Sequence, residues 1–398
     1  MKFPSLNKER QANDWSYVGE GNQNLVVRYV GSDRAFIGKV LRVIKSNDKN
    51  KHVNRQTLLL QKEFMDKVVR PLLGKEYVLD LQPVATGEQF LAQLAANVQS
   101  ARPSSRLETE IITDAPVSFI MTDLTQMWPG KPTLTFELKP KWGFKPSCGT
   151  VTEIKLLYCR FCMHSHLRDT KPNGYCPMDL YSESTSMVHK ALDVLLRTSP
   201  QEKTLKISIN GQNISLIEAD PDAEYKRLLG IASQQALLLE ILKAIVIQDP
   251  ILPLLKTLQA DLDSLDVENI LPLYQQQQDN IEADIDTFAE VVENYKKRIL
   301  HPDTPTTDIQ RVLEYVLSMT FKDCSIMINV IPATAVSRHK SITLDNGLMF
   351  HYDVKVIDTD LKKLDKIPYW YELDQNIVNF ALETRFSKAS ACFSNKRS

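Results

Sequence analysis

The sequence predicts an α+β fold with a small sheet-rich part at its start and a larger mixed part after it. Strand-like segments around a glycine-containing turn occupy residues 14–45, and strand-like segments return at residues 322–358. Helical periodicity dominates residues 222–298 between them. No internal repeat is visible, and 398 residues are enough for two domains, which we expect at residues 1–124 and 125–398.

The first part should alternate strands and helices. A turn through Gly19 and Gly21 should join the first two strands, and Thr122-Asp123-Leu124 should form a hinge at the end of this part. We expect strands at residues 15–18, 25–30, 35–44, 76–83 and 117–121, and helices at residues 54–72 and 86–100.

The second part should begin with a lysine-rich strand and continue through a segment rich in cysteine and histidine. A short glutamine run at residues 275–278 should be a solvated helix or loop. We expect strands at residues 135–141, 205–209, 322–329, 341–346 and 349–358, and helices at residues 182–198, 222–298, 307–319 and 374–385.

Composition sets limits on function. The formal net charge is -1, so bulk attraction to nucleic acid or to a membrane surface is not predicted. The first residues, Met1 to Trp15, are polar, and no apolar run reaches the length of a membrane span. We therefore expect an intracellular protein, in the cytoplasm or the nucleus, that requires neither a membrane nor nucleic acid.

A strand around residue 138 carries charges on one face. Phe136 and Leu138 should lie on one side, while Glu137, Lys139 and Lys141 lie on the other, because successive strand side chains alternate. Three ionisable groups on one face are costly to bury without partners. They could be an exposed strand with salt bridges, or cations that bind phosphate.

Two carboxylates adjoin apolar strands. Asp323 precedes the apolar run from Cys324 to Val330, and Asp358 follows the run from Val354 to Ile357. Both could be ordinary carboxylates at strand ends. A carboxylate held at the edge of a rigid sheet is also well placed for metal binding or proton abstraction. With lysines on another element, these groups can hold phosphates and a divalent metal together.

The turn at Gly19-Glu20-Gly21 has two interpretations. It can be a plain hairpin turn, or a loop whose glycines let the backbone approach nucleotide phosphates. It is not a Walker A loop, because no Gly-Lys-Ser/Thr follows. Arg42, on the next strand but one, is a candidate for contact with nucleotide phosphates.

The cysteines indicate a metal site. Four of the six lie between residues 148 and 176, and in an intracellular protein such clustering favours metal over disulfides. Buried or free thiols are the alternative. We expect a structural Zn²⁺ with four protein ligands, and His166 is preferred to His164 because it would share a helical face with Cys162. The predicted ligands are Cys159, Cys162, Cys176 and His166, with Cys148 as a spare.

Several motifs together resemble one family, the inositol-pentakisphosphate 2-kinases. They span nearly the whole chain and occur in the order of the family. They are Gly19-Glu20-Gly21-Asn22-x-Asn24-Leu25-Val26, Glu137-Leu138-Lys139-Pro140-Lys141-x-Gly143-Phe144, Arg160-Phe161-x-Met163-His164, Cys176-Pro177-Met178-Asp179-Leu180-Tyr181-Ser182, Lys322-Asp323-Cys324-Ser325-Ile326-Met327-Ile328 and Asp358-x-Asp360-x-Lys362.

The resemblance implies a two-lobed fold distantly similar to protein kinases, with a nucleotide-binding N-terminal lobe. It implies transfer of the ATP γ-phosphoryl group, with Mg²⁺, to the 2-hydroxyl of inositol pentakisphosphate, which yields inositol hexakisphosphate, or phytate. We expect such an enzyme to act as a monomer. The alternatives are a non-catalytic inositol-phosphate binding or scaffold protein on the same fold, and a different ATP-dependent kinase with a small polar substrate.

The resemblance also assigns roles to single residues. Lys139 is expected to touch the transferring phosphoryl group, Asp323 to be the general base, and Asp358 to bind magnesium. Lys366 stands where the family is expected to have an arginine, which puts a bidentate contact there in doubt. The expected nucleotide contacts are Gly19, Gly21, Asn22, Asn24, Arg42, Asp123 and Lys206, and the expected substrate contacts are Arg102, Lys141, Arg168, Lys203, Lys362 and Lys366.

The charge of the substrate agrees with this assignment. Five phosphates with about two charges each carry roughly ten negative charges. In a chain with a formal net charge of -1, the cations that bind such a molecule must converge from separate segments. The basic candidates do come from separate segments.

Overall fold

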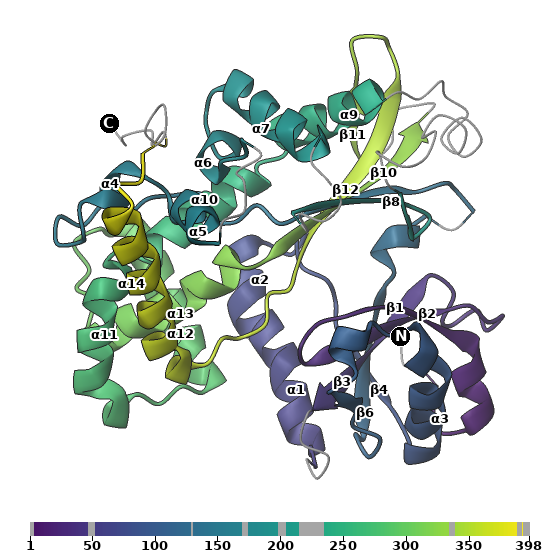
Figure 1. Cartoon of the computed structure of the whole chain (residues 1–398). Helices are drawn as coiled ribbons and strands as arrows, with labels where there is room; N and C mark the ends of the chain where they lie inside the picture. The colour runs from purple at the N-terminus through teal and green to yellow at the C-terminus, as the bar shows by residue number, and fades with distance from the viewer. Residues whose placement is uncertain are drawn as a thin grey trace. The chain divides into compact units, whose positions relative to one another are not determined.

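The computed structural model describes residues 4–46, 52–128, 130–168, 174–197, 204–214, 235–333, 339–387 and 392. Helices and two β-sheets make up this part of the chain, which confirms the predicted α+β class (Figure 1). The chain divides into two compact units. Unit 1 comprises residues 1–64, 79–135 and 209–212, and unit 2 comprises residues 65–78, 136–208 and 213–398.

Unit 1 is built on an antiparallel sheet in the order β1-β2-β3-β6-β4, with β5 paired to β3. β3 starts later than predicted, because residues 34–38 form a turn in which the Asp33 carboxylate accepts a hydrogen bond from the Ala35 amide. The strands are β1 (Trp15–Glu20), β2 (Asn24–Tyr29), β3 (Lys39–Ser46), β4 (Gln82–Ala85), β5 (Glu110–Ile111) and β6 (Val117–Thr122).

One hydrophobic core holds unit 1 together. Helix α3 (Glu88–Val98) buries Phe90, Leu91 and Leu94 in the same core as Leu25 and Val27 of β2. Their alternation along β2 with partly exposed residues is the pattern of a strand with one face in the core.

The predicted helix at residues 54–72 consists of α1 (Arg55–Phe64), a π-helix η2 (Met65–Val69) and α2 (Arg70–Leu73), which ends at Gly74 with φ of 89°.

The second sheet has the order β11-β12-β10-β7-β8-β9. β10 and β12 pair antiparallel with Ser325 opposite Ile357, so Ser325 lies one residue from Asp358. Sequence reasoning placed these strands well, because each is a run of β-branched and aromatic residues. The strands are β7 (Leu134–Leu138), β8 (Leu205–Ile209), β9 (Gln212–Asn213), β10 (Ser325–Ala333), β11 (Lys340–Thr343) and β12 (Met349–Ile357).

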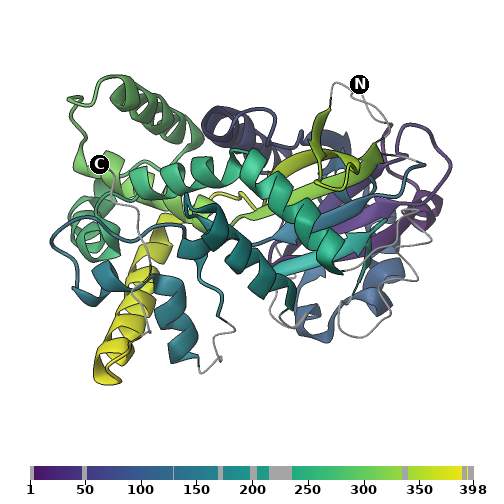
Figure 2. The ribbon, with the colours of Figure 1, turned by 90° about the horizontal axis from the view of Figure 1, so that it is seen from above.

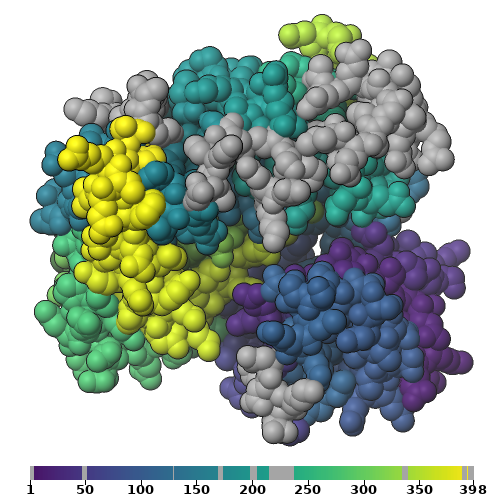
Figure 3. Space-filling view, in the orientation of Figure 1, coloured from purple at the N-terminus to yellow at the C-terminus, as the bar shows by residue number. Residues whose placement is uncertain are grey.

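Helices make up most of the rest of unit 2. α9 lies beside β11 in both ribbon views (Figures 1 and 2). α14 packs against α11. In the space-filling view α14 lies at the surface of unit 2, where it is yellow (Figure 3). The helices are α4 (Ile154–Leu157), α5 (Arg160–Leu167), α6 (Pro177–Leu180), α7 (Thr185–Arg197), α9 (Gln235–Gln248), α10 (Ile251–Asp261), α11 (Asp266–Gln277), α12 (Ile285–Leu300), α13 (Asp308–Lys322) and α14 (Ile367–Glu383).

A buried lysine ties three of these helices together. Lys155 of α4 is 3% exposed, and its Nζ lies 2.5 Å from Asp266 of α11 and 2.6 Å from Asp374 of α14. Burial alone would lower the pKa of Lys155, but Asp374 and Asp266 outweigh burial and raise it. Removing Lys155 would leave Asp266 and Asp374 buried without the cation that they share.

None of the described helices combines the length and the apolar character that crossing a membrane requires.

Candidate active site

The centre of the candidate site is a triangle of polar side chains on unit 2. Lys139 follows β7, and its Nζ lies 3.0 Å from Asp358 Oδ2 and 2.8 Å from the Ser325 hydroxyl oxygen. The Ser325 hydroxyl lies 3.0 Å from the same Asp358 oxygen. The pairing of β10 with both β7 and β12 thus brings a lysine and a carboxylate that are far apart in the sequence into contact.

Asp323 lies at the C-terminal end of α13, as the cap residue just before β10. Its carboxylate is 68% exposed and accepts a hydrogen bond from Lys362 at 3.0 Å. Burial works to lower the pKa of Lys139, but attraction to Asp358, and then to Glu137 and Asp323, raises it. Asp323 is therefore one of three carboxylates that favour the charged form of Lys139.

The loop after Lys139 adds a second lysine. Lys141 has a φ of 64°, a left-handed conformation that only a few per cent of non-glycine residues adopt. Burial lowers its pKa, and repulsion from Lys139 and Arg168 lowers it further. An anion bound among these three cations would reverse that effect, because an opposite charge favours the protonated amine.

Helix α5 contributes more positive charge. Arg168 is exposed at its C-terminal end, and His164 lies one turn earlier. Burial, followed by repulsion from Arg160, Arg168 and Lys141, lowers the pKa of His164 to about 4. Arg160 and His164 were not among the predicted contacts, although both belong to the Arg160-Phe161-x-Met163-His164 motif.

Three further predicted contacts are Lys206, Lys366 and Lys203. Lys206 of β8 pairs with Glu137 at 3.0 Å, in line with the predicted charged strand face. Lys366 is exposed, with its Nζ 5.7 Å from the centre of the Tyr369 ring. Lys203 lies outside the described residues.

Arg102 does not belong to the accessible cations. It is 8% exposed within unit 1, and its guanidinium donates to both carboxylate oxygens of Glu20 at 2.9 Å. It also donates to the carbonyl oxygens of Arg106 and Thr109, each at 2.7 Å. The substrate contact of Arg102 stays a prediction. In this structure Arg102 and Lys45 both bind the Glu20 carboxylate, and so support the Gly19-Glu20-Gly21 turn from inside.

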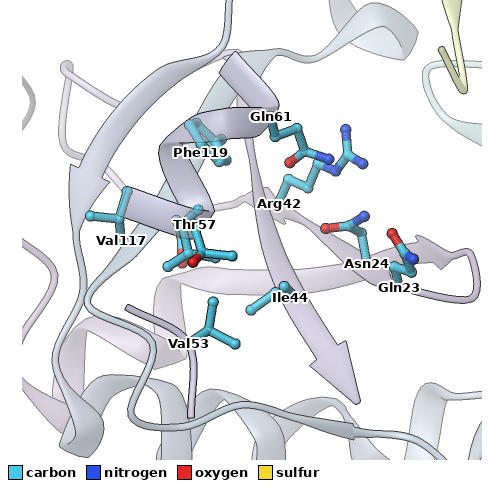
Figure 4. Close-up of a pocket in the computed structure, with 11 residues that line it drawn as sticks. Gln23, Asn24, Arg42, Ile44, Val53, Thr57, Gln61, Val117 and Phe119 are labelled. Atoms are coloured by element: carbon cyan, nitrogen blue, oxygen red, sulfur yellow. The ribbon is translucent and has the colours of Figure 1, made fainter. Parts of the chain in front are cut away.

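Unit 1 has a pocket of about 160 Å³ next to that turn (Figure 4). The polar ends of Gln23, Asn24, Arg42 and Gln61 lie on one side of it, and Val53 and Ile44 lie on the other. The structure thus brings together two of the predicted nucleotide contacts, Asn24 and Arg42. A mixed lining of this kind suits a ligand with an apolar ring system and a charged group.

Apart from Lys206, which belongs to unit 2, the other predicted nucleotide contacts lie elsewhere in unit 1. Asn22 accepts a hydrogen bond from Arg106, and a Cβ on Gly19 or Gly21 would meet nothing within 4 Å. Asp123 is 2% exposed and caps the turn after β6, where its carboxylate binds Arg28 and the Thr125 amide. The Asp123 carboxylate is therefore already paired with Arg28 and the Thr125 amide in this structure.

The cysteine cluster forms with a different fourth member. The sulfur atoms of Cys159 and Cys162 each lie 3.7 Å from that of Cys176, and Cys392 lies 3.8 Å from Cys162. All four are buried, and their sulfur atoms lie within 4.8 Å of one another. Four thiolates at this spacing fit tetrahedral Zn²⁺.

His166 is the correction to the predicted ligands. Its Nε2 lies 2.8 Å from the Thr384 hydroxyl, and its ring packs against Phe380 and Phe386. Cys392 was missed because it lies far from the other three in sequence, and its only signal was an unassigned cysteine. Cys148 also lies apart, with its sulfur 3.2 Å from the Leu265 carbonyl oxygen.

A lysine that faces one carboxylate, a second carboxylate nearby and a group of cations are an arrangement that one class of protein uses, the phosphate-transferring enzymes. The chain belongs to the inositol-pentakisphosphate 2-kinase family, whose model matches residues 17–376. Relatives named inositol-pentakisphosphate 2-kinase include proteins from Danio rerio, 29% identical over 94% of each chain, and Arabidopsis thaliana, 28% identical over 94% of each. One from Cryptococcus neoformans is 26% identical over 96% of each chain. These comparisons confirm the resemblance that the motifs indicated.

Proposed function

We propose that this chain transfers the γ-phosphoryl group of ATP to the 2-hydroxyl of inositol pentakisphosphate and so forms inositol hexakisphosphate. The observation that carries the proposal is the contact of Lys139 with both Ser325 and Asp358, with Asp323 in electrostatic reach. The names of the family and of its relatives in vertebrates, plants and fungi support the same activity.

In this proposal Asp323 takes the proton of the substrate 2-hydroxyl. The hydroxyl oxygen forms a bond to the γ-phosphorus of ATP, and the bond between that phosphorus and the β-phosphate oxygen breaks, which releases ADP. The exposed carboxylate of Asp323 is open to a substrate hydroxyl. Lys139 contacts the transferring phosphoryl oxygens and offsets their charge. Asp358 would hold Mg²⁺, which neutralises charge on the nucleotide phosphates when it is bound.

The phosphates that do not react would be bound by cations around Lys141. Lys141 is repelled by Lys139 and Arg168 in the free protein, and burial together with the positive charge of Arg160, Arg168 and Lys141 keeps His164 neutral. Lys362 donates one hydrogen bond to Asp323, and its ammonium has further donors that a phosphate could accept from. A bound polyanion would offset the repulsion between these cations. The protein has already placed the cations close together in its free state, so binding gains attraction without having to assemble them.

We further propose that unit 1 binds the nucleotide in the pocket that contains Asn24 and Arg42, as in a lobe distantly similar to that of protein kinases. Neither packing nor φ requires glycine at position 19 or 21, whereas close approach of a phosphate would. The cysteine cluster would hold a structural Zn²⁺ through Cys159, Cys162, Cys176 and Cys392.

The test is to incubate the purified chain with ATP, Mg²⁺ and inositol pentakisphosphate and to look for a sixth phosphate. Inositol hexakisphosphate and ADP in equal amounts are expected. Binding of the pentakisphosphate without any product would favour the non-catalytic binding protein. Product from a different polar acceptor alone would favour another kinase.

A further inference from the structure

Gln259 lies between two segments of the candidate site, the loop that carries Lys141 and the end of α13 next to Asp323. It is on α10, is 0% exposed, and belongs to none of the motifs that identified the family. Its carboxamide reaches the loop that carries Lys141 on one side and the end of α13, next to Asp323, on the other.

Every polar atom of the Gln259 side chain is used. Oε1 accepts a hydrogen bond from the Gly143 amide at 2.7 Å, and Nε2 donates to the Lys141 carbonyl oxygen at 3.1 Å. Nε2 also donates to the Phe321 carbonyl oxygen at 2.9 Å. One carboxamide therefore joins three backbone groups from two segments that are far apart in sequence, which fixes their separation.

The loop needs such support because its backbone is strained. A left-handed conformation at Lys141 persists only where its surroundings impose it. Two tyrosines assist. The Tyr175 hydroxyl donates to the Pro140 carbonyl oxygen at 3.1 Å, and the Tyr181 hydroxyl donates to the Lys141 carbonyl oxygen at 3.4 Å. Gln259 is the contact that also reaches α13.

Lys322 joins the same two segments by a second route. It precedes Asp323, is 2% exposed, and binds Asp263 at 2.6 Å. Its Nζ lies 4.3 Å from the centre of the Trp142 ring and 5.2 Å from that of Phe144, on the loop beyond Lys141. Lys322, the residue before Asp323, thus packs against two aromatic rings that follow Lys141 in the sequence.

We propose that Gln259 is a positioning residue that fixes the Lys141 loop relative to Asp323, with Lys322 as its supporting contact. This inference rests on the proposed function, because it concerns the alignment of the base and the substrate phosphates. Displacement of reacting groups by about 1 Å can cost on the order of 10²-fold in rate.

The test compares Gln259→Met with Gln310→Met. Methionine has a similar length to glutamine but makes none of these hydrogen bonds. Gln310 is also buried, at 8% exposure, and donates to Glu314 at 2.9 Å near the opposite end of α13 from Asp323. Both variants should lower the melting temperature, so the pair separates loss of positioning from loss of stability.

We expect Gln259→Met to lower kcat by about 10- to 10²-fold and to raise KM for inositol pentakisphosphate, with the Kd for ATP unchanged. Gln310→Met should keep the kinetic constants of the parent chain in its folded fraction. Parent-like kcat and KM in Gln259→Met would overturn the proposal, and so would an equal loss in Gln310→Met.

Gln259→Glu keeps the shape and provides a second test. Its carboxylate would face two carbonyl oxygens at neutral pH, whereas the protonated acid can donate to one of them. The ratio of its kcat to that of the parent chain should rise as pH falls. A ratio that does not change with pH would contradict the proposed hydrogen bonds.

A third readout does not depend on turnover. The Gly143 amide should exchange with deuterium faster in Gln259→Met than in Gln310→Met, because its acceptor is gone. Equal exchange would refute the positioning role even in an active enzyme. If the parent chain shows no kinase activity but this exchange difference appears, the proposed function fails while the hydrogen bonds of Gln259 to the Lys141 loop are confirmed.

Discussion

Two residues of the candidate site have a left-handed backbone conformation although neither is glycine. Lys141 has a φ of 64° and Asp358 a φ of 61°. Each such residue costs roughly 1–2 kcal/mol, so its surroundings must impose it. Gln259 holds the backbone of Lys141, while Ser325 and Lys139 hold the carboxylate of Asp358.

Asp358→Asn should lower turnover by at least about 10²-fold while inositol pentakisphosphate still binds. The amide has the size of the carboxylate but lacks the charge that pairs with Lys139 and would hold Mg²⁺. Turnover is measured with saturating ATP and Mg²⁺, and binding by calorimetry. Parent-like turnover would remove Asp358 from the proposed catalytic group.

His164 should take up a proton when a polyanion binds. Its pKa of about 4 in the free protein lies below the ordinary value because of burial and the neighbouring cations Arg160, Arg168 and Lys141. Negative charge at this position favours the imidazolium, so the pKa should rise on binding. Proton resonances of the imidazole, titrated with and without inositol hexakisphosphate, give both values.

The control for that titration is His189, which lies on α7. Its pKa is lowered by burial and then by Lys243. None of the cations that act on His164 acts on it, so its titration should not respond to the ligand. An unchanged pKa of His164 would mean that inositol phosphate binds elsewhere.

At the scale of elements, the loop after β7 depends on close contact with Tyr181. A Cβ on Gly143 would lie 2.5 Å from that ring, a distance that real Cβ atoms do not show. A glycine is needed there because the backbone approaches the ring. The same is not true of Gly149, later in the same segment, whose Cβ would meet nothing within 4 Å.

Gly143→Ala should therefore reduce the free energy of unfolding by about 1–3 kcal/mol through overpacking. It should also raise KM for inositol pentakisphosphate, because the Lys141 loop has to move. Gly149→Ala is the matched control and should change neither quantity measurably. Equal stability of the two variants, by thermal or denaturant unfolding, would contradict the packing described here.

At the scale of the whole molecule, the cysteine cluster joins segments that are distant along the chain. Cys159 and Cys162 flank the start of α5, Cys176 precedes α6, and Cys392 comes from the last described residue. A metal bound by all four would add its binding free energy to that of folding.

The chain purified without chelator should contain about one zinc ion. Cys392→Ser should lose it and lower the melting temperature, since three thiolates bind zinc less tightly than four. His166→Ala and Cys148→Ser should keep the metal, because neither side chain lies in the cluster. Elemental analysis decides between them, and a zinc-free parent chain would end the metal proposal.

The sequence by itself determined the fold class, most of the elements and the family. Alternation and apolar runs located β10 and β12 within a few residues, because these signals are local. Helix α14 was predicted to begin at residue 374 but begins at Ile367, because Pro368 in its first turn starts a helix whose aromatic residues resemble a strand.

Only the tertiary structure decided which of the candidate residues meet. Ser325 joins Lys139 to Asp358 because of strand register, and Arg102 is buried against Glu20 although its sequence position resembled a substrate contact. Cys392 replaces His166 in the cluster because the chain's last described residue returns to α5. Contacts between distant segments leave no periodic pattern in sequence, so packing and register alone establish them.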